Sequence, residues 1–68
     1  MGERLVNRLR ELRAERDLTQ AALAERVSVS RKTINTVENG IFIPSTVLAL
    51  RLARALGTSV EAIFQLRE

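Results

Sequence analysis

Apolar residues recur three or four positions apart through most of this chain, the spacing that places side chains on one face of an α-helix. Polar or turn-forming residues divide the pattern into five segments, over about residues 3–16, 20–27, 31–39, 46–56 and 60–66. The apolar positions of the first four segments are Leu5, Val6, Leu9 and Leu12; Leu23, Ala24 and Val27; Ile34 and Val37; and Leu48, Ala49, Leu52, Ala53 and Leu56. No segment alternates convincingly as a strand, although residues 41–43 are β-prone. The pattern predicts an all-α fold of five helices.

Residues suited to capping stand at the ends of these segments. A Ser or Thr hydroxyl before a helix accepts a hydrogen bond from an unpaired backbone N–H group, and a left-handed residue commonly ends a helix. The expected N-caps are Thr19, Ser30, Ser45 and either Thr58 or Ser59, and the expected end residues are Asp17, Gly40 and Gly57. The helices are therefore expected to be short and sharply bounded.

Size and composition restrict what the chain can do. Its 68 residues suffice for one small domain, over residues 1–68, and the absence of Cys and His excludes disulfides and the common zinc sites. A core of this size is marginal, so self-association is the leading candidate for added stability. No apolar run approaches the length of a membrane span and no signal-peptide core follows the N-terminus, so we expect a cytoplasmic protein without a membrane partner.

The net charge of +3 and the isoelectric point of about 11.1 are compatible with an anionic partner. Proteins that bind single strands usually stack bases on aromatic side chains, and the only aromatic residues here are Phe42 and Phe64. The composition therefore favours duplex DNA over single-stranded nucleic acid.

The third segment has the polarity of a helix that enters a DNA groove. Ile34 and Val37 share one side of it, whereas the opposite side is polar. That polar side consists of Lys32, Asn35, Thr36 and Asn39. Lys32 can donate to guanine O6 and N7, and Asn35 can pair with adenine through two hydrogen bonds. Arg31 can reach a base or a phosphate, and the start of the second segment at Thr19 and Gln20 suits a phosphate.

These residues resemble the Cro/repressor-type (XRE-type) helix-turn-helix regulators. The matching positions are Leu12-Arg13, Leu18-Thr19-Gln20, Leu23-Ala24, Val29-Ser30-Arg31, Thr33-Ile34, Glu38-Asn39-Gly40, Pro44-Ser45, Ala49-Leu50, Leu52-Ala53 and Ile63-Phe64. The resemblance covers nearly the whole chain. It implies a five-helix Cro/repressor-like domain in which the second and third helices form the helix-turn-helix.

The resemblance also implies roles for individual residues. Arg31, Lys32 and Thr36 would be the main groove readers, with Thr33 and Asn35 secondary. Gln20 would contact a phosphate and brace the third helix, Asn39 would touch the DNA backbone, and Ser30 belongs to the same expected DNA-binding set. Arg13 would pair with Glu38, which also follows from physics because a partly buried Glu needs a cation.

The sequence departs from the family pattern in three places. Ser28 and Asp17 stand where Gly is common, and a left-handed Ser costs about 1 kcal/mol relative to Gly. The loop at residues 41–43 is apolar where relatives are often basic, and no Lys or Arg lies between Lys32 and Arg51. Fewer phosphate contacts imply a shallower salt dependence of binding.

Two surfaces have alternative interpretations. The arginines of the first segment could follow a phosphate backbone, but interleaved acidic residues favour an ordinary solvated face. A second group of apolar residues is expected to lie outside the core, and we interpret it as a two-fold dimer interface rather than as loop residues folded over the core. It comprises Ile41, Phe42, Ile43, Val47, Leu50 and Leu66.

The function that we expect is therefore a homodimeric, sequence-specific repressor that binds the major groove of duplex DNA at an inverted repeat. An antitoxin or a restriction-system controller of the same fold is one alternative, and a protein adaptor or coactivator is another. The residue types do not form a catalytic site, so we expect neither enzyme activity nor a cofactor, metal or small-molecule ligand.

Overall fold

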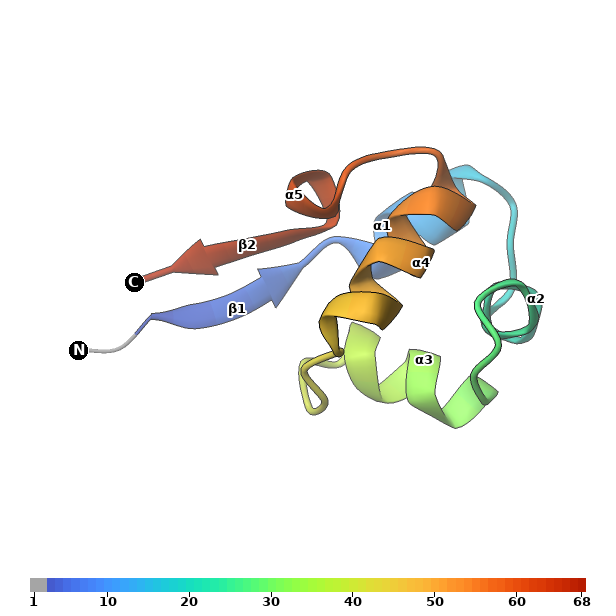
Figure 1. The fold of residues 1–68 in the computed structure, drawn as a ribbon, viewed down its shortest axis with the longest axis horizontal. Coiled ribbons are helices and arrows are strands. Elements are labelled where there is room, and N and C mark those ends of the chain that lie inside the picture. The colour runs from blue at the N-terminus through green and yellow to red at the C-terminus, as the bar shows by residue number, and fades with distance from the viewer. Residues whose placement is uncertain (1–2) are drawn as a thin grey trace.

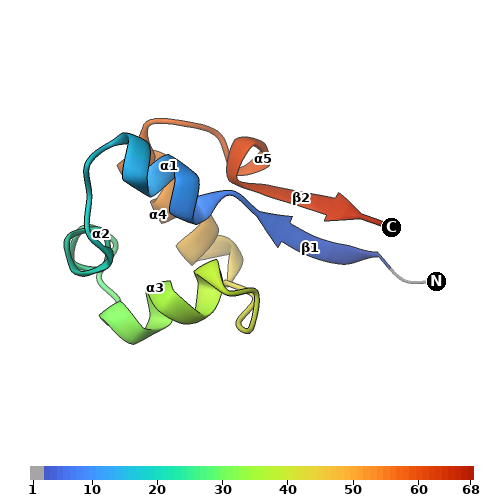
Figure 2. The same cartoon turned by 180° about the vertical axis from the view of Figure 1, so that it is seen from behind.

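A body of five helices carries a short antiparallel ribbon made from both ends of the chain (Figure 1). The computed structural model describes residues 3–68. The elements in chain order are β1 (Arg4–Asn7), α1 (Leu9–Glu15), α2 (Gln20–Arg26), α3 (Arg31–Glu38), α4 (Thr46–Leu56), α5 (Val60–Ile63) and β2 (Phe64–Arg67). Figure 2 gives the opposite view, in which α1 lies across α4 and the ribbon projects away from the helices. The ribbon leaves the outer surface of α3 uncovered.

Every helix contributes a large side chain with no exposed surface to a single core. These side chains are Leu9, Leu23, Ile34, Leu52 and Ile63, each with 0 % of its surface exposed. Burying a side chain of this size contributes about 1.5–3 kcal/mol relative to leaving it exposed. The core therefore fixes the relative positions of all five helices, including α3.

Side-chain hydroxyls cap four of the five helices, as the sequence predicts. Thr19, Ser30, Ser45 and Ser59 accept hydrogen bonds from backbone N–H groups three residues later, at 3.0–3.1 Å. The fifth helix is capped by Ser59 rather than Thr58. The cap of α3 fixes where that helix starts, and so which side chains stand in its first turn.

Left-handed residues end the segments at the predicted places. Gly40 and Gly57 have φ of 74° and 67°, and Asp17 and Ser28 adopt φ of 56° and 62°. A left-handed conformation is unfavourable for a residue with a Cβ atom, so Asp17 and Ser28 carry local strain. At Ser28 this conformation makes the sharp turn that sets α3 across α2.

The all-α prediction is wrong at both ends of the chain. The first helix begins at Leu9 rather than near residue 3, and the fifth ends at Ile63 rather than near residue 66. β1 and β2 pair instead, with Leu5 opposite Leu66. The Asn7 carboxamide oxygen accepts from the backbone N–H of Leu9 at 3.0 Å, which starts the helix at that point. Pairing with a strand at the other end of the chain outweighs the local helical pattern.

Two polar side chains fasten α1 to its neighbours. The Asn7 amide donates to the carbonyl of Val37 at the end of α3, at 3.0 Å. Arg16 donates through Nε to the carbonyl of Leu56 at the end of α4, at 2.6 Å. The Leu56 carbonyl is one that a helix end leaves unpaired, whereas the Val37 carbonyl also accepts from the backbone N–H of Gly40 at 3.0 Å. α1 is thereby tied to the ends of α3 and α4.

Candidate nucleic-acid interface

α2 and α3 pack against each other as a helix-turn-helix whose second helix has one buried and one exposed side. Ile34 and Val37 anchor α3, with 0 % and 1 % of their surfaces exposed. The outward side carries Arg31, Lys32, Asn35 and Asn39, which are exposed, and Thr33 and Thr36, which are half-buried. The structure therefore brings the predicted DNA-binding residues of α3 together on one surface, with Gln20 of α2 beside them.

The carboxylate of Glu38 is the centre of a polar network beneath this surface. Its side chain is 0 % exposed and accepts hydrogen bonds from Arg13 Nε at 2.6 Å and Arg13 Nη2 at 3.2 Å. Arg10 Nε lies 3.4 Å from Oε1, and Gln20 Nε2 donates to the same oxygen at 3.0 Å. Arg13 also donates to the carbonyl of Leu18. One buried carboxylate thus joins α1, α2 and α3.

Opposing effects act on the pKa of Glu38. Burial raises the pKa of this carboxyl, but hydrogen bonds from Arg13 and Gln20, the charge of Arg13 and a hydrogen bond from Arg10 together lower it below its usual value. The pKa of Arg13 is raised, mainly by its hydrogen bond to Glu38. Both groups are therefore charged near neutral pH, and the pair is a buried ion pair.

The network continues to the exposed amides of α3 and closes on itself. Gln20 Nε2 also donates to Asn35 Oδ1 at 3.2 Å, and Asn39 Nδ2 donates to that same oxygen at 3.3 Å. Arg10 Nη2 donates to Asn39 Oδ1 at 2.8 Å and so returns to Glu38. We call these five residues, Arg10, Gln20, Asn35, Glu38 and Asn39, the amide ring. It holds the exposed side chains of Asn35 and Asn39 in fixed orientations.

The hydroxyl groups of α3 are engaged within the helix. Ser30 Oγ lies 3.0 Å from Thr33 Oγ1, and Thr36 Oγ1 donates to the carbonyl of Thr33 at 2.9 Å. The side chains of Arg31 and Lys32 make no hydrogen bond or ion pair within residues 3–68. These two cations therefore reach outward from the first turn of α3, where the helix dipole disfavours them.

Six large apolar residues outside the core are exposed, in the loop at residues 41–43, on α4 and on β2. Their exposed fractions are 76 % for Ile41, 47 % for Phe42, 71 % for Ile43, 57 % for Val47, 56 % for Leu50 and 65 % for Leu66. The loop at residues 41–43 therefore does not fold over the core. These are the residues that the sequence marks as a dimer interface.

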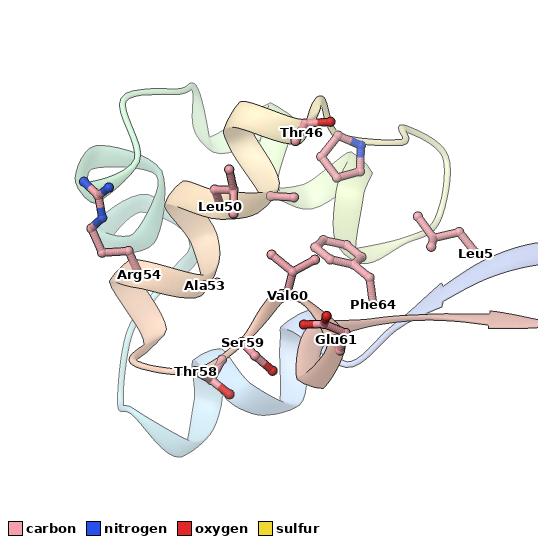
Figure 3. Close-up of a pocket in the computed structure, with 12 residues that line it drawn as sticks. Leu5, Thr46, Leu50, Ala53, Arg54, Thr58, Ser59, Val60, Glu61 and Phe64 are labelled. Atoms are coloured by element: carbon pink, nitrogen blue, oxygen red, sulfur yellow. The ribbon is translucent and has the colours of Figure 1, made fainter.

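An apolar groove of about 790 Å³ lies beside Leu50, between α4 and the segment from α5 to β2 (Figure 3). Ala53, Val60 and Phe64 line it, and Leu50 stands on its rim. Arg54 and Glu61 also lie on the rim, well apart from each other in Figure 3, and neither forms an ion pair within the described part of the chain. The groove is apolar within, with an unpaired cation and an unpaired anion at its edge.

Sequence reasoning missed two contributors to this site. The sequence pattern predicts a solvated face for Arg10, and 61 % of its side chain is exposed, but it joins Glu38 to Asn39. The sequence pattern predicts that Asn7 lies within a continuous helix, whereas its side chain accepts a hydrogen bond at the start of α1 and holds the end of α3. No local signal distinguishes Arg10 from its neighbouring arginines, because its partners lie 28 and 29 residues away.

This fold and this exposed polar helix define a helix-turn-helix DNA-binding protein. A family described as "Helix-turn-helix domain" matches residues 4–63. The chain belongs to this family, among the transcriptional regulators of the Cro/repressor (XRE) type.

Relatives with the same fold span much of the chain. An uncharacterized HTH-type transcriptional regulator of Methanothermobacter thermautotrophicus is 54 % identical over 61 residues, which cover 88 % of each chain. YgzD of Bacillus subtilis is 39 % identical, over 91 % of this chain and 94 % of its own. The restriction-modification controller protein C.AhdI of Aeromonas hydrophila aligns with a TM-score of 0.77 at 38 % identity, over 81 % of this chain and 83 % of that one.

Two further matches concern larger proteins. The immunity repressor of Bacillus phage phi105 is 39 % identical over 82 % of this chain, which spans 39 % of the repressor. Hydroxypropylphosphonic acid epoxidase of S. wedmorenis shares the fold at a TM-score of 0.74, but this chain covers 29 % of that enzyme. The latter match concerns only a small part of an enzyme.

Residues 3–68 contain no helix long and apolar enough to cross a membrane. They also contain no cluster of three or more Asp and Glu side chains that could hold a metal ion.

Proposed function

We propose that this protein is a sequence-specific repressor that binds an inverted-repeat operator in duplex DNA as a homodimer. The observation that carries the proposal is the exposed side of α3, where Arg31 and Lys32 reach outward without protein partners on a helix fixed by Ile34 and Val37. The major groove admits one α-helix, and side chains near its N-terminus usually contact the bases. The proposed site of action is the cytoplasm, where bacterial and archaeal DNA lies.

Lys32 and Arg31 are the proposed readers of base identity. A good contact with two hydrogen bonds to a guanine is worth about 1–3 kcal/mol of discrimination. Gln20 is proposed to brace α3, since both hydrogens of its amide are engaged by Glu38 and Asn35. Thr33 and Thr36 contribute methyl and hydroxyl groups at the groove surface, and Asn39 is proposed to lie at the DNA backbone.

The proposed dimer uses the six exposed apolar residues and the groove beside Leu50. A two-fold axis repeats the same surface on both subunits, so a rim that carries both Arg54 and Glu61 is complementary to a second copy of itself. Leu50 of each copy would enter the apolar groove of the other. Two copies of α3 would then contact successive major grooves about 34 Å apart on an inverted repeat.

Selection of bound duplexes from a random pool at moderate salt tests the DNA-binding proposal. We expect an enriched sequence with two-fold symmetry, and Lys32→Ala should relax its base preferences. An unenriched pool would instead favour the adaptor alternative. Sedimentation at micromolar concentration tests the dimer, because Leu50→Arg should yield a monomer of 7.6 kDa where the parent chain sediments as a dimer. A monomeric parent chain would refute the dimer.

The likeness to C.AhdI supports a second candidate, a controller of restriction-modification genes. This candidate requires the same DNA-binding surface and differs only in the genes that are regulated. The genes next to this one distinguish it from a general repressor, since this candidate predicts restriction-modification genes beside it.

A further inference from the structure

The charged members of the amide ring fix the orientation of every amide in it. The Glu38 carboxylate can only accept hydrogen bonds, so the atom of Gln20 that faces Glu38 must be Nε2. The atom of Asn35 that faces this nitrogen must then be Oδ1. From the other side, the Arg10 guanidinium can only donate, so it faces Asn39 Oδ1 and leaves Asn39 Nδ2 to donate to Asn35. Both directions around the ring give the same assignment.

This assignment decides what Asn35 presents to the outside. A carboxamide oxygen has two lone pairs, and those of Asn35 accept from Gln20 at 3.2 Å and from Asn39 at 3.3 Å. The two hydrogens of Asn35 Nδ2 have no partner within the described residues. The outward end of Asn35 can therefore donate hydrogen bonds but not accept them, because both lone pairs of its oxygen are already used.

We propose that Asn35 reads its base as a donor only, and that the base it selects is guanine. Guanine displays two neighbouring acceptors in the major groove, O6 and N7, which match the two hydrogens of Nδ2. Adenine needs an acceptor for its N6 amino group, and Asn35 could supply one only by breaking two bonds of the ring. The geometry thus excludes the paired contact with adenine that the sequence alone suggests. This inference rests on the proposed entry of α3 into the groove.

Gln20 and Asn39 act in this scheme as positioning residues. Neither needs to touch the base that Asn35 selects. They determine which end of the Asn35 amide points outward. Glu38 and Arg10 in turn determine the orientations of the Gln20 and Asn39 amides. The base preference at this operator position therefore depends on the charges of Arg10 and Glu38. The side chain of Glu38 is completely buried.

Asn35→Asp tests the inference with almost no change of shape. The carboxylate keeps an oxygen toward Gln20 and Asn39, so the ring stays paired, while the outward group changes from a donor to an acceptor. Asn35→Ala is the matched control, because it removes the outward group without reversing it. The base pair that Asn35 contacts is the one whose preference disappears in Asn35→Ala.

Selected duplexes and binding titrations provide the readout for the three proteins. At that base pair we expect the parent chain to prefer guanine about tenfold or more over adenine. Asn35→Asp should prefer cytosine, whose N4 amino group donates, and Asn35→Ala should show no preference. Replacing that guanine by 7-deazaguanine should weaken the parent chain and leave Asn35→Ala unchanged. Adenine preference in the parent chain, or guanine preference in Asn35→Asp, would overturn this inference but not the proposed function.

A measurement on the free protein separates this inference from the proposed function. In the NMR spectrum, the side-chain amide hydrogens of Gln20 should be protected from exchange with water, whereas those of Asn35 should exchange rapidly. The reverse pattern overturns the ring assignment even if DNA is bound. A chain with the expected pattern that enriches no DNA sequence overturns the proposed function, and with it the role of Asn35 as a reader.

Discussion

Replacing Glu38 by Gln tests how much the buried ion pair stabilises the fold. The substitution keeps the shape of the side chain but removes its charge and turns one acceptor into a donor that faces other donors. Arg13, with 16 % of its side chain exposed, then lacks its counter-charge. Breaking a buried pair in this way costs about 3–5 kcal/mol. We expect the lower end, about 3 kcal/mol, because Arg13 keeps its bond to the Leu18 carbonyl.

That loss is large for a chain of 68 residues, whose free energy of unfolding should be about 3–10 kcal/mol. Urea denaturation followed by circular dichroism at fixed protein concentration measures it, since the chain has no Trp or Tyr for fluorescence. The control is Glu11→Gln, which alters an exposed pair with Arg8 at 3.8 Å. We expect that change to stay within about 0.5 kcal/mol.

The pH dependence identifies Glu38 as the source of the difference. The pKa of Glu38 is lowered in the folded state, so its contribution is complete above the unfolded value of about 4.3 and is lost as pH falls through the folded pKa. A protonated Glu38 is close in shape and charge to Gln. The unfolding free energies of the parent chain and Glu38→Gln should therefore converge at acid pH. A difference that stays constant from pH 7 to pH 3, or that is below about 1 kcal/mol at pH 7, would refute this account.

Three further predictions concern strain, capping and electrostatics. Ser28→Gly should stabilise the protein by about 0.5–1 kcal/mol in urea denaturation, because φ at this turn is 62°; a destabilised variant would contradict the strain. Ser45→Ala should cost about 1 kcal/mol in the same assay, since it removes the cap of α4 at Leu48 N; Ser59→Ala, at the cap of the shorter α5, provides a comparison. For operator binding, the logarithm of the association constant plotted against the logarithm of salt concentration should have a slope shallower than about −5, because the apolar loop at residues 41–43 supplies no phosphate contact. A steeper slope would show that other cations contact the DNA phosphates.

The interior of the fold was predictable because its signals are local. Thr19, Ser30 and Ser45 cap the helices that they precede, and the glycines at 40 and 57 end them as expected. Each of these signals depends only on neighbours within one helical turn. The helix-turn-helix was therefore correctly placed from the sequence, together with the exposed side of α3.

The two ends of the chain were not predictable in the same way. Leu5 and Val6 continue the spacing of Leu9 and Leu12, so a helix from residue 3 satisfies the local pattern. What decides otherwise is pairing between Leu5 and Leu66, which are 61 positions apart. A four-residue strand is too short to be recognised from its own sequence without its partner. The hydrogen bonds of the amide ring were not predictable for the same reason, because they join residues of three helices that are far apart in the sequence.

The pairing of Arg4 with Arg67 places both ends of the described chain at one point, on a ribbon that projects away from α3 (Figure 1). Anything joined to either end leaves the body there, clear of α3, the helix that we propose enters the DNA groove. A tag, a fluorescent protein or a sensor domain could therefore be attached at either end without obstructing α3. A linker joining the two ends would need only a few residues, because Arg4 and Arg67 are paired across the ribbon.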